Sequence, residues 1–439
     1  MRRTLFFIPH EVAGIPVFGF GLALGLLGLV FVMRLAWAAR QRSVFESASA
    51  SRPGTQPAPH QPPTVAQVFV HEGFIWASAA AIIVAVLPGV ELENADGQPV
   101  GMAIRGYGVM LLLGVVSAVL LAAYRAKRAG MNPDLIFELA PWVFVGGIAG
   151  ARLFYVIQYY DHFVGATTWE TVKNMLAFTE GGLVVYGSFI GGFLAFALFT
   201  VRRHLPILRF GDVIVPALFL GVFFGRIGCL LNGCCYGGRC EPDWASLRFP
   251  PITKVYQEQL SSGELLGMTI DPSTGIIESV APESTAAELG IQPGDLYQGG
   301  EFDRRPLETA PETVPAEDVQ RGWIMRVSGK THVLSPEQLP AAALPVRAAQ
   351  PISSVSSLIL CLALCFASLF IRREGALMFL GFASYAVLRF VLEIVRVDEA
   401  GQFNTTLSIS QWVSLVVFGI SIVGLIWVAK RGTSSAATA

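Results

Sequence analysis

Nine stretches of the sequence are apolar and long enough to cross a lipid bilayer as α-helices. A membrane-spanning helix needs about 20 mostly apolar residues. The stretches cover residues 13–33, 69–90, 105–124, 136–158, 183–201, 212–232, 351–371, 376–396 and 409–429. Only 14% of the residues are charged, against about 25% in an average soluble domain. The sequence therefore predicts an all-α polytopic membrane protein, surrounded by a lipid bilayer.

The short loops predict how these helices are oriented, because Lys and Arg gather on the cytoplasmic side of a membrane. Basic clusters follow the first, third, fifth, seventh and ninth stretches. We therefore expect an outer N-terminus and a cytoplasmic C-terminus. Arg2 and Arg3 oppose this assignment. The first stretch is too long for a cleaved signal peptide and lacks an A-x-A site, so we interpret it as a permanent helix.

Two polar segments interrupt the apolar pattern. Residues 43–64 are rich in Ser, Pro and Ala, which is typical of a flexible linker. Residues 241–349 contain 16 Asp and Glu against 8 Lys and Arg, and predict a soluble acidic domain on the outer face. We divide the chain into a two-helix extension, a first part of the membrane core, an inserted domain and a second part of the core: 1–100, 101–250, 251–349 and 350–439.

The insert contains the segment GIIESVAPESTAAELGIQPGD at residues 275–295. A short strand at Ile276, Ile277 and Val280 is followed by a helix from Ser284 that Gly290 ends. This pattern resembles a PDZ domain, with Leu265–Met268 at the place of the carboxylate-binding loop. The resemblance implies a small α+β domain that binds a protein partner by strand addition. The alternative is a generic α+β insert that acts as a spacer.

Arginines recur inside the predicted helices, where a charge is costly and usually functional. Arg152 lies in GGIAGARLFYV and Arg226 in GRIGCLLNGCCYGG. A later helix carries a polar face at spacings of four, four and three residues, and Tyr107 opens an earlier helix. Several guanidinium groups near one outer region favour a phosphate ligand. Alternatively, the later helix holds an internal i,i+4 pair and the other arginines snorkel to the surface. The polar face consists of Tyr385, Arg389, Glu393 and Arg396.

These segments together resemble the prolipoprotein diacylglyceryl transferases. That family's motif is G-R-x-G-N-F-x-N-x-E-x-x-G, and the matching residues here are Gly225, Arg226, Gly228, Asn232 and Gly237. Family segments also resemble GYGVM, GARLFYV, EGGLVVYGSFIGG at 180–192, YAVLRFVLEIVRVD and LSISQ at 407–411, in the same order. The family has seven helices, so the first two helices and the insert are additions.

The resemblance implies transfer of a diacylglyceryl group from phosphatidylglycerol to the lipobox cysteine of a prolipoprotein, in the bacterial inner membrane. It implies that Arg226 and Arg389 hold the lipid phosphate and stabilise the leaving group. Tyr107 and Tyr385 line the headgroup site, and Glu393 positions Arg389. Asn232 and Gly237 shape the outer loop. The prolipoprotein's signal peptide is the expected second partner, and no cofactor is expected.

Several positions depart from the family pattern. Tyr186, before Gly187, replaces a histidine that is suited to deprotonate a thiol, since its ordinary pKa is near 6.5. Cys229 and Cys234 replace an asparagine and a glutamate. Gln350 replaces a second histidine. We include Tyr107 and Tyr186 among the catalytic candidates and add Gly187, Arg152 and Arg396 as substrate-binding candidates. A non-catalytic protein that binds or transports an anionic lipid, with the insert as a sensor, is the competing interpretation.

Four cysteines gather around the end of the predicted sixth helix: Cys229, Cys234, Cys235 and Cys240. A disulfide that fastens the loop is the simplest interpretation in an oxidising compartment. A catalytic thiol is an alternative. The C-x4-C-C-x4-C spacing matches no standard zinc site and no histidine is near, so no metal is expected from the sequence.

Overall fold

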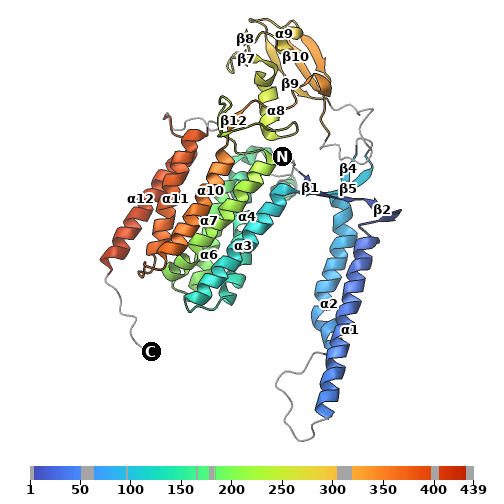
Figure 1. Ribbon diagram of the computed structural model, residues 1–439, viewed down its shortest axis with the longest axis vertical. Helices are drawn as coiled ribbons and strands as arrows, with labels where there is room; N and C mark the ends of the chain where they lie inside the picture. The colour runs from blue at the N-terminus through green and yellow to red at the C-terminus, as the bar shows by residue number, and fades with distance from the viewer. Residues whose placement is uncertain are drawn as a thin grey trace. The chain divides into compact units, whose positions relative to one another are not determined.

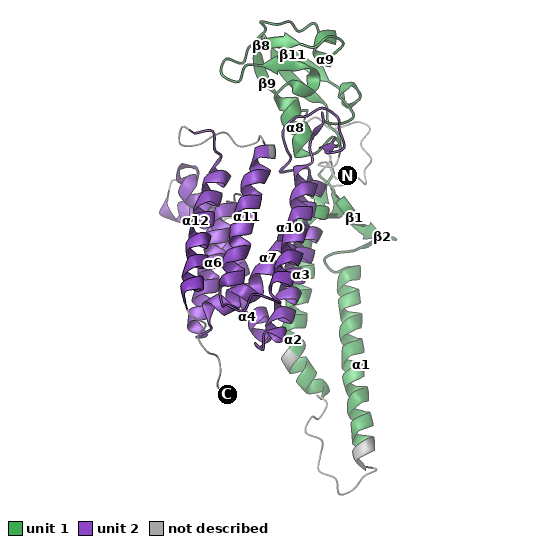
Figure 2. Ribbon diagram, turned by 60° about the vertical axis from the view of Figure 1, so that its left-hand side comes forward, with its two compact units in different colours: residues 1–106, 249–343 green, residues 107–248, 344–439 purple. Residues whose placement is uncertain are grey.

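The computed structural model describes residues 4–50, 64–94, 97–164, 167–176, 182, 184–303, 319–396 and 405–431. Within these residues, nine helices are long and apolar enough to cross a membrane, which confirms the predicted polytopic α-helical fold. The chain divides into two compact units (Figure 2). One contains residues 1–106 and 249–343, and the other contains residues 107–248 and 344–439.

The first unit begins with a helical hairpin of α1 (Leu22–Ala50) and α2 (Val65–Ala81), and the second helix continues as η1 (Ile82–Val86) and η2 (Leu87–Val90). An ion pair joins Arg34 Nη2 to Glu72 Oε1 at 2.6 Å within the hairpin. A small sheet with the order β1-β5-β4 accompanies it. Its strands are β1 (Thr4–Pro9), β5 (Pro99–Arg105) and β4 (Leu92–Glu93).

Both boundaries of α1 differ from the sequence prediction. The helix begins at Leu22 and not near residue 13, because β2 (Glu11–Val12) and β3 (Ile15–Pro16) form a hairpin there. Gly14 turns this hairpin with a φ of +77°, a conformation that glycine adopts without a steric penalty. At its other end α1 continues through Ala50, so residues 43–50 are helical. The remaining linker residues, 51–63, lie outside the described residues.

The insert is a small α+β domain, as predicted. Its elements are α8 (Lys254–Ser261), η5 (Glu264–Leu266), β7 (Met268–Ile270), β8 (Ile277–Val280), α9 (Thr285–Glu288), β9 (Tyr297–Phe302), β10 (Trp323–Val327), β11 (Lys330–Leu334) and η6 (Pro336–Gln338). β7 pairs with β8, and a second sheet has the order β11-β10-β9. The predicted helix from Ser284 is confirmed, because the Ala287 N–H donates to Ser284 Oγ at 3.3 Å. Gly290 follows this helix with a φ of +74°, as predicted for its end.

The second unit contains the seven long helices of the membrane core among its described residues (Figure 1). They are α3 (Gly106–Arg128), α4 (Asp134–Gln158), α6 (Val185–Arg202), α7 (Ile207–Asn232), α10 (Ala349–Ala367), α11 (Ala376–Val395) and α12 (Ile409–Lys430). Shorter elements are η3 (Tyr160–His162), α5 (Thr168–Leu176) and the paired strands β6 (Ser246–Leu247) and β12 (Val346–Arg347).

Helix α7 is central in this packing. Its Phe210, Val213 and Ala217 belong to a buried cluster with residues of α3, α4 and α6. Val215 and Phe219 belong to a second buried cluster with residues of α10 and α11. Helix α7 therefore connects both halves of the bundle through contacts on two sides of its N-terminal half.

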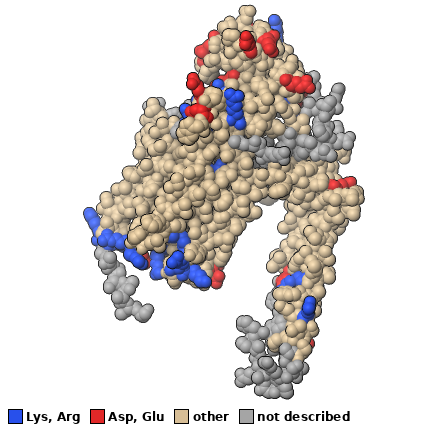
Figure 3. Space-filling view, in the orientation of Figure 1, with Lys and Arg blue, Asp and Glu red and all other residues tan. Residues whose placement is uncertain are grey.

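Charged residues mark one end of the bundle. Figure 3 shows Lys and Arg gathered at the end where α3, α6 and α12 finish. At this end Asp212 of α7 accepts the amides of Gly375 and Met378 at 2.6 and 2.7 Å, so it satisfies two orphan N–H groups of the first turn of α11. Tyr107, Tyr186, Asn232 and Arg396 lie at the helix ends on the opposite side of the core, as their positions in α3, α6, α7 and α11 require.

Candidate functional site

A polar network joins α6, α11 and α12 inside the core. Arg389 Nη2 lies 2.9 Å from Glu393 Oε2 and donates to Ser410 Oγ at 2.9 Å. Ser410 Oγ also lies 2.8 Å from the hydroxyl of Tyr186. Ser408 donates to Glu393 Oε1 at 3.2 Å. The Glu393 side chain is only 3% exposed, so the ion pair is desolvated and each charge depends on the other.

This network leaves part of Arg389 available. Its contacts with described residues use Nη2 alone, and Nε and Nη1 have no hydrogen bond to any of them. The Arg389 side chain is 17% exposed. Because the i,i+4 pair with Glu393 holds one nitrogen, the planar group is oriented while the N–H groups of the other two nitrogens remain for an anionic ligand. The predicted pairing of Arg389 with Glu393 is confirmed.

A second group of predicted residues meets where α7 ends. Tyr107 at the start of α3 interacts electrostatically with Arg226 of α7 and with nearby thiols. Gly228 permits this approach, because a Cβ added there would lie 3.1 Å from the Tyr107 ring. Arg226 and Arg396 both interact with the thiol of Cys235. Arg226 is partly buried and its guanidinium has no hydrogen bond or ion pair within the described part of the chain.

Three cysteines belong to this second group. The Sγ atoms of Cys229, Cys234 and Cys235 lie within 4.8 Å of one another. All three are free thiols in this structure, as are Cys240 and the two cysteines of α10. Hydrogen bonds from Cys229 and Cys234, aided by the two guanidiniums, hold the pKa of Cys235 below its ordinary value. The two cations beside Cys235 favour the thiolate form of this residue.

The loop after α7 is fastened by hydrogen bonds. Gln350 is fully buried and donates from Nε2 to the Cys234 carbonyl at 2.9 Å. Asn232 donates from Nδ2 to Cys234 Sγ at 3.6 Å. The buried Gly237 donates its N–H to the Arg347 carbonyl at 3.0 Å, which aligns the loop beside β12. Asn232 and Gly237 therefore contact the loop that they were predicted to shape.

Arg152 has a different environment. Its guanidinium donates to the carbonyls of Met175, Asn174 and Gly182 at 2.8, 2.9 and 3.3 Å. It also lies over the rings of Tyr155 and Phe163, and the residue is only 5% exposed. The structure does not bring Arg152 into contact with either polar group described above. Its role in binding substrate stays a prediction.

Two other predicted residues contribute packing contacts. A Cβ added to Gly187 would lie 2.3 Å from the carbonyl oxygen of Gly150, so this glycine allows α6 and α4 to touch through their backbones. Tyr385 lies with its ring 5.4 Å from that of Phe219 on α7 and belongs to the partly buried surroundings of the second cluster. Their predicted contacts with substrate stay predictions.

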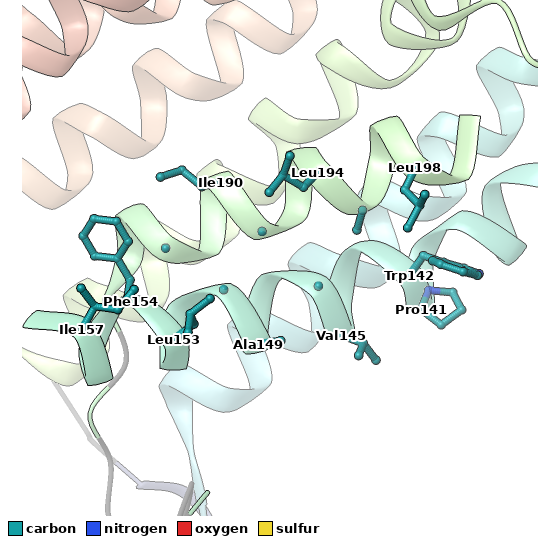
Figure 4. Close-up of a pocket in the computed structure, with 15 residues that line it drawn as sticks. Pro141, Trp142, Val145, Ala149, Leu153, Phe154, Ile157, Ile190, Leu194 and Leu198 are labelled. Atoms are coloured by element: carbon teal, nitrogen blue, oxygen red, sulfur yellow. The ribbon is translucent and has the colours of Figure 1, made fainter. Parts of the chain in front are cut away.

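A groove of about 680 Å³ follows the contact between α4 and α6. Figure 4 shows Leu153, Phe154 and Ile157 of α4 and Leu194 and Leu198 of α6 along it. The lining is almost entirely apolar and includes Gly187, but it contains none of the predicted cationic residues. The lining offers a phosphate no cationic side chain, so the polar groups at the ends of α7 and α11 remain the candidate headgroup site.

Ser408, Ser410 and Gln350 were not among the predicted site residues. The serines belong to the segment LSISQ, and Ser408 forms a capping box with Gln411 at the start of α12. That N-terminal signature was readable in the sequence. The partners of Ser410 and Gln350 lie 224 and 116 residues away in the chain, and no local pattern indicates contacts of that range.

Comparisons with known proteins place the sequence among its relatives. The family model described as prolipoprotein diacylglyceryl transferase matches residues 98–427. A phosphatidylglycerol–prolipoprotein diacylglyceryl transferase of Rhodopirellula baltica is 42% identical in an alignment that covers 99% of this chain and 90% of that protein. The enzyme of the same name from Clostridium tetani is 39% identical over 31% of this chain and 53% of its own length.

The Rhodopirellula baltica alignment extends over the first two helices and the insert, since it includes nearly the whole chain. The Clostridium tetani alignment includes 137 residues. The additional segments are thus shared with at least one relative, and the family match includes every predicted site residue. The chain belongs to the prolipoprotein diacylglyceryl transferase family.

Proposed function

We propose that this chain transfers the diacylglyceryl group of phosphatidylglycerol to the lipobox cysteine thiol of prolipoproteins, the first step of bacterial lipoprotein maturation. A sulfur–carbon bond forms at the glycerol carbon, and the carbon–oxygen bond to the phosphate breaks. The electron pair of that bond goes to the departing glycerol phosphate. The catalyst must therefore stabilise charge that develops on a phosphate oxygen.

This proposal rests mainly on the N–H donors that two arginines leave available. Arg389 is oriented by Glu393 and Ser410 through one nitrogen, and its remaining donors have no partner among the described residues. Arg226 likewise has no hydrogen-bond partner within the described ranges, and it is near Tyr107. Planar guanidiniums with available donors suit bidentate binding of phosphate oxygens. In this proposal Arg226 and Arg389 bind the phosphate and stabilise the leaving group.

The remaining residues have supporting roles in the proposal. Tyr107 and Tyr385 line the headgroup site, and Tyr186 orients Arg389 through Ser410. Arg396 adds positive charge beside Cys235, which its electrostatic contact supports. The loop residues Asn232 and Gly237 shape the outer boundary, together with Gly187 and Arg152 on the side of α4 and α6.

The proposed location is the bacterial inner membrane, with an outer N-terminus and insert and a cytoplasmic C-terminus. The gathering of Lys and Arg at one end of the core supports this orientation (Figure 3), because short cytoplasmic loops are enriched in those residues. The polar site then lies towards the outer leaflet, where a secreted prolipoprotein emerges.

We further propose that the insert binds a protein partner. β7 pairs with β8 alone among the described strands, so it leaves one edge for strand addition. Gly267 precedes β7 with a φ of +85°, and a Cβ there would lie 2.4 Å from Cβ of Ser284. The loop is thereby held against the start of α9, the place that a PDZ-like domain uses for a peptide end.

Complementation tests the transferase function. A bacterial strain depleted of its own transferase receives this gene, and lipoprotein modification is measured by the shift of prolipoprotein to the modified form. We expect modification with the natural chain and none with Arg226→Ala at equal expression. Correctly inserted protein that leaves the precursor unmodified would support a lipid-binding function without catalysis.

A deletion separates the insert from the chemical step. Residues 254–345 are replaced by a Gly/Ser linker, and transfer to a short lipobox peptide is compared with transfer to a full prolipoprotein. We expect the peptide reaction to persist while the prolipoprotein reaction declines. Complete loss of peptide transfer in inserted, folded protein would assign the domain to the active site.

A further inference from the structure

The three thiols at the end of α7 have the geometry of a metal site. The Sγ atoms of Cys229, Cys234 and Cys235 lie within 4.8 Å of one another. Three thiolates that each bind Zn²⁺ at about 2.3 Å are separated by roughly 3.8 Å in a tetrahedron, so a small contraction is sufficient. No other group of three His, Cys, Asp or Glu side chains converges in this way in the part of the chain that the structure describes.

The backbone adopts an unfavourable conformation where it brings these thiols together. Gly233 ends α7 in the left-handed region, and Cys235 adopts a φ of +59°. That conformation costs a non-glycine residue about 1 kcal/mol or more and persists where the surroundings impose it, commonly at functional sites. The Cys234 amide donates to the Cys229 carbonyl at 3.1 Å. Together with the Gln350 contact, these bonds hold the loop without a disulfide.

The surrounding charge fits a thiolate–metal group. Three thiolates with one Zn²⁺ carry a net charge of −1, and the guanidiniums of Arg226 and Arg396 interact with Cys235. Soft thiolate ligands select Zn²⁺ or Cu⁺ over hard cations. Three protein ligands with one open position are typical of catalytic zinc, whereas structural zinc sites are closed by four.

The reaction needs a group that activates a thiol, and the family histidine is absent. Tyr186 stands in its place, with its hydroxyl 2.8 Å from Ser410 Oγ. The second unit contains two histidines, His162 and His204. The ring contact of His162 is to Tyr159, and His204 follows α6 at the basic end of the core. The described structure thus brings no imidazole into contact with the candidate site.

We propose that Cys229, Cys234 and Cys235 bind one Zn²⁺ ion as thiolates, and that the open fourth position receives the acceptor cysteine of the prolipoprotein. This inference rests on the proposed transferase function. Bound hydroxide takes the proton of the incoming thiol and leaves as water. The coordinated sulfur then attacks the glycerol carbon, and the electron pair of the broken carbon–oxygen bond goes to the phosphate. Arg226, beside the thiols, binds that phosphate.

Metal content tests the site without reference to activity. Full-length protein in detergent is reduced, stripped with a chelator, reloaded with Zn²⁺ and analysed by elemental mass spectrometry. We expect about one zinc per chain, lost in Cys229→Ser, Cys234→Ser and Cys235→Ser variants and kept in Cys365→Ser, a thiol of α10. In Co²⁺-loaded protein, sulfur-to-cobalt charge-transfer absorption reports thiolate ligation. Zinc that survives all three substitutions, or reduced protein that binds none, overturns the site.

Activity then tests the role of the ion. Chelation is expected to lower transfer to a lipobox peptide by about 10²-fold or more, the range of proton-transfer catalysis, with recovery on Zn²⁺ addition. Added peptide should perturb the cobalt spectrum, and a Cys→Ser peptide should not. Full activity of metal-free protein overturns the zinc proposal and leaves the transferase function intact. A disulfide between two of the three cysteines in active protein, measured by thiol labelling, overturns it as well. Zinc binding with no transfer under any condition instead contradicts the proposed function.

Discussion

Two arginine-bearing regions of the membrane core have the same sequence character and different structures. The guanidinium of Arg152 on α4 donates hydrogen bonds to three backbone carbonyls in the segment that follows this helix. Arg389 on α11 contacts a carboxylate and a hydroxyl through one nitrogen. Both lie in apolar helices and both are mostly buried. The number of donors that remain available therefore decides which arginine suits a phosphate, and helix position alone does not.

The same contrast applies to Arg152 and Arg226, which both lie towards the C-terminal ends of their helices. Around Arg152 the contacts are to main chain and to aromatic rings, which are permanent parts of the fold. Arg226 instead lies near Tyr107 and the thiol of Cys235, and it has no hydrogen bond or ion pair within the described part of the chain. We infer that the first region stabilises the core and that the second performs chemistry.

The largest expected effect follows removal of the available donors. Arg226→Ala and Arg389→Ala should each lower the rate of transfer by about 10²–10³-fold, the usual cost of losing a donor that stabilises transition-state charge. Lys at either position should recover little, because an ammonium lacks the planar fork. Transfer of radiolabelled diacylglyceryl to a lipobox peptide measures the rate. Arg128→Ala, at the far end of α3, is the control and should be normal. Normal turnover in either site variant would contradict the phosphate role.

Arg152→Ala should act on stability instead. Loss of the guanidinium leaves three carbonyls without their donor. A hydrogen bond to a charged group contributes about 1.5–3 kcal/mol to the free energy of unfolding. We expect a lower midpoint of thermal inactivation in detergent, with near-normal activity per folded molecule at low temperature.

The kinetic constants distinguish the two roles of Arg152. A raised KM for phosphatidylglycerol in fully folded Arg152→Ala protein would show that this residue binds substrate, and the contrast between the two regions would then fail. Arg128→Ala serves again as the control, since Arg128 is exposed and, among the described residues, its side chain is hydrogen-bonded only to Tyr124.

Contacts between residues close together in the sequence could be predicted, whereas contacts between distant residues could not. Helix length and apolar content were sufficient for the seven core helices, and the spacing of four residues was sufficient for the Arg389–Glu393 pair. The donors of Arg152 meet carbonyls 22 to 30 residues away, across a connection that no periodicity describes. Sequence therefore places an arginine in a helix, and the fold decides whether it is saturated.

Local backbone conformation was also hard to predict from the sequence. The C-x4-C-C spacing gave no reason to expect three converging thiols, because their approach depends on the left-handed conformation of Cys235. The early start predicted for α1 failed for a related reason, since Gly14 turns a hairpin inside an apolar stretch. In the insert, by contrast, Ser284 and Gly290 act through local capping, and both were predicted.

A smaller effect is expected from Ser410→Ala. The hydroxyl lies between Tyr186 and Arg389, so its loss removes one hydrogen bond to the guanidinium, worth about 1 kcal/mol. We expect a decline in kcat of roughly fivefold with little change in stability. Ser356→Ala is the control, because within the described part of the chain that hydroxyl donates only to carbonyls of its own helix, α10. An unchanged kcat would show that Glu393 alone orients Arg389.

The smallest effect is expected from Tyr385→Phe. This substitution removes the hydroxyl and keeps the aromatic ring, so it separates their contributions. The ring packs on Phe219 at 5.4 Å, and the hydroxyl has no hydrogen bond to a described residue. Because Phe keeps the ring contact, stability should stay within about 0.5 kcal/mol, as for substitutions that remove no contact. If the hydroxyl also meets the lipid headgroup, the KM for phosphatidylglycerol should rise while kcat stays constant. An unchanged KM would limit the role of Tyr385 to packing between α11 and α7, and Tyr107 would remain as the tyrosine of the headgroup site.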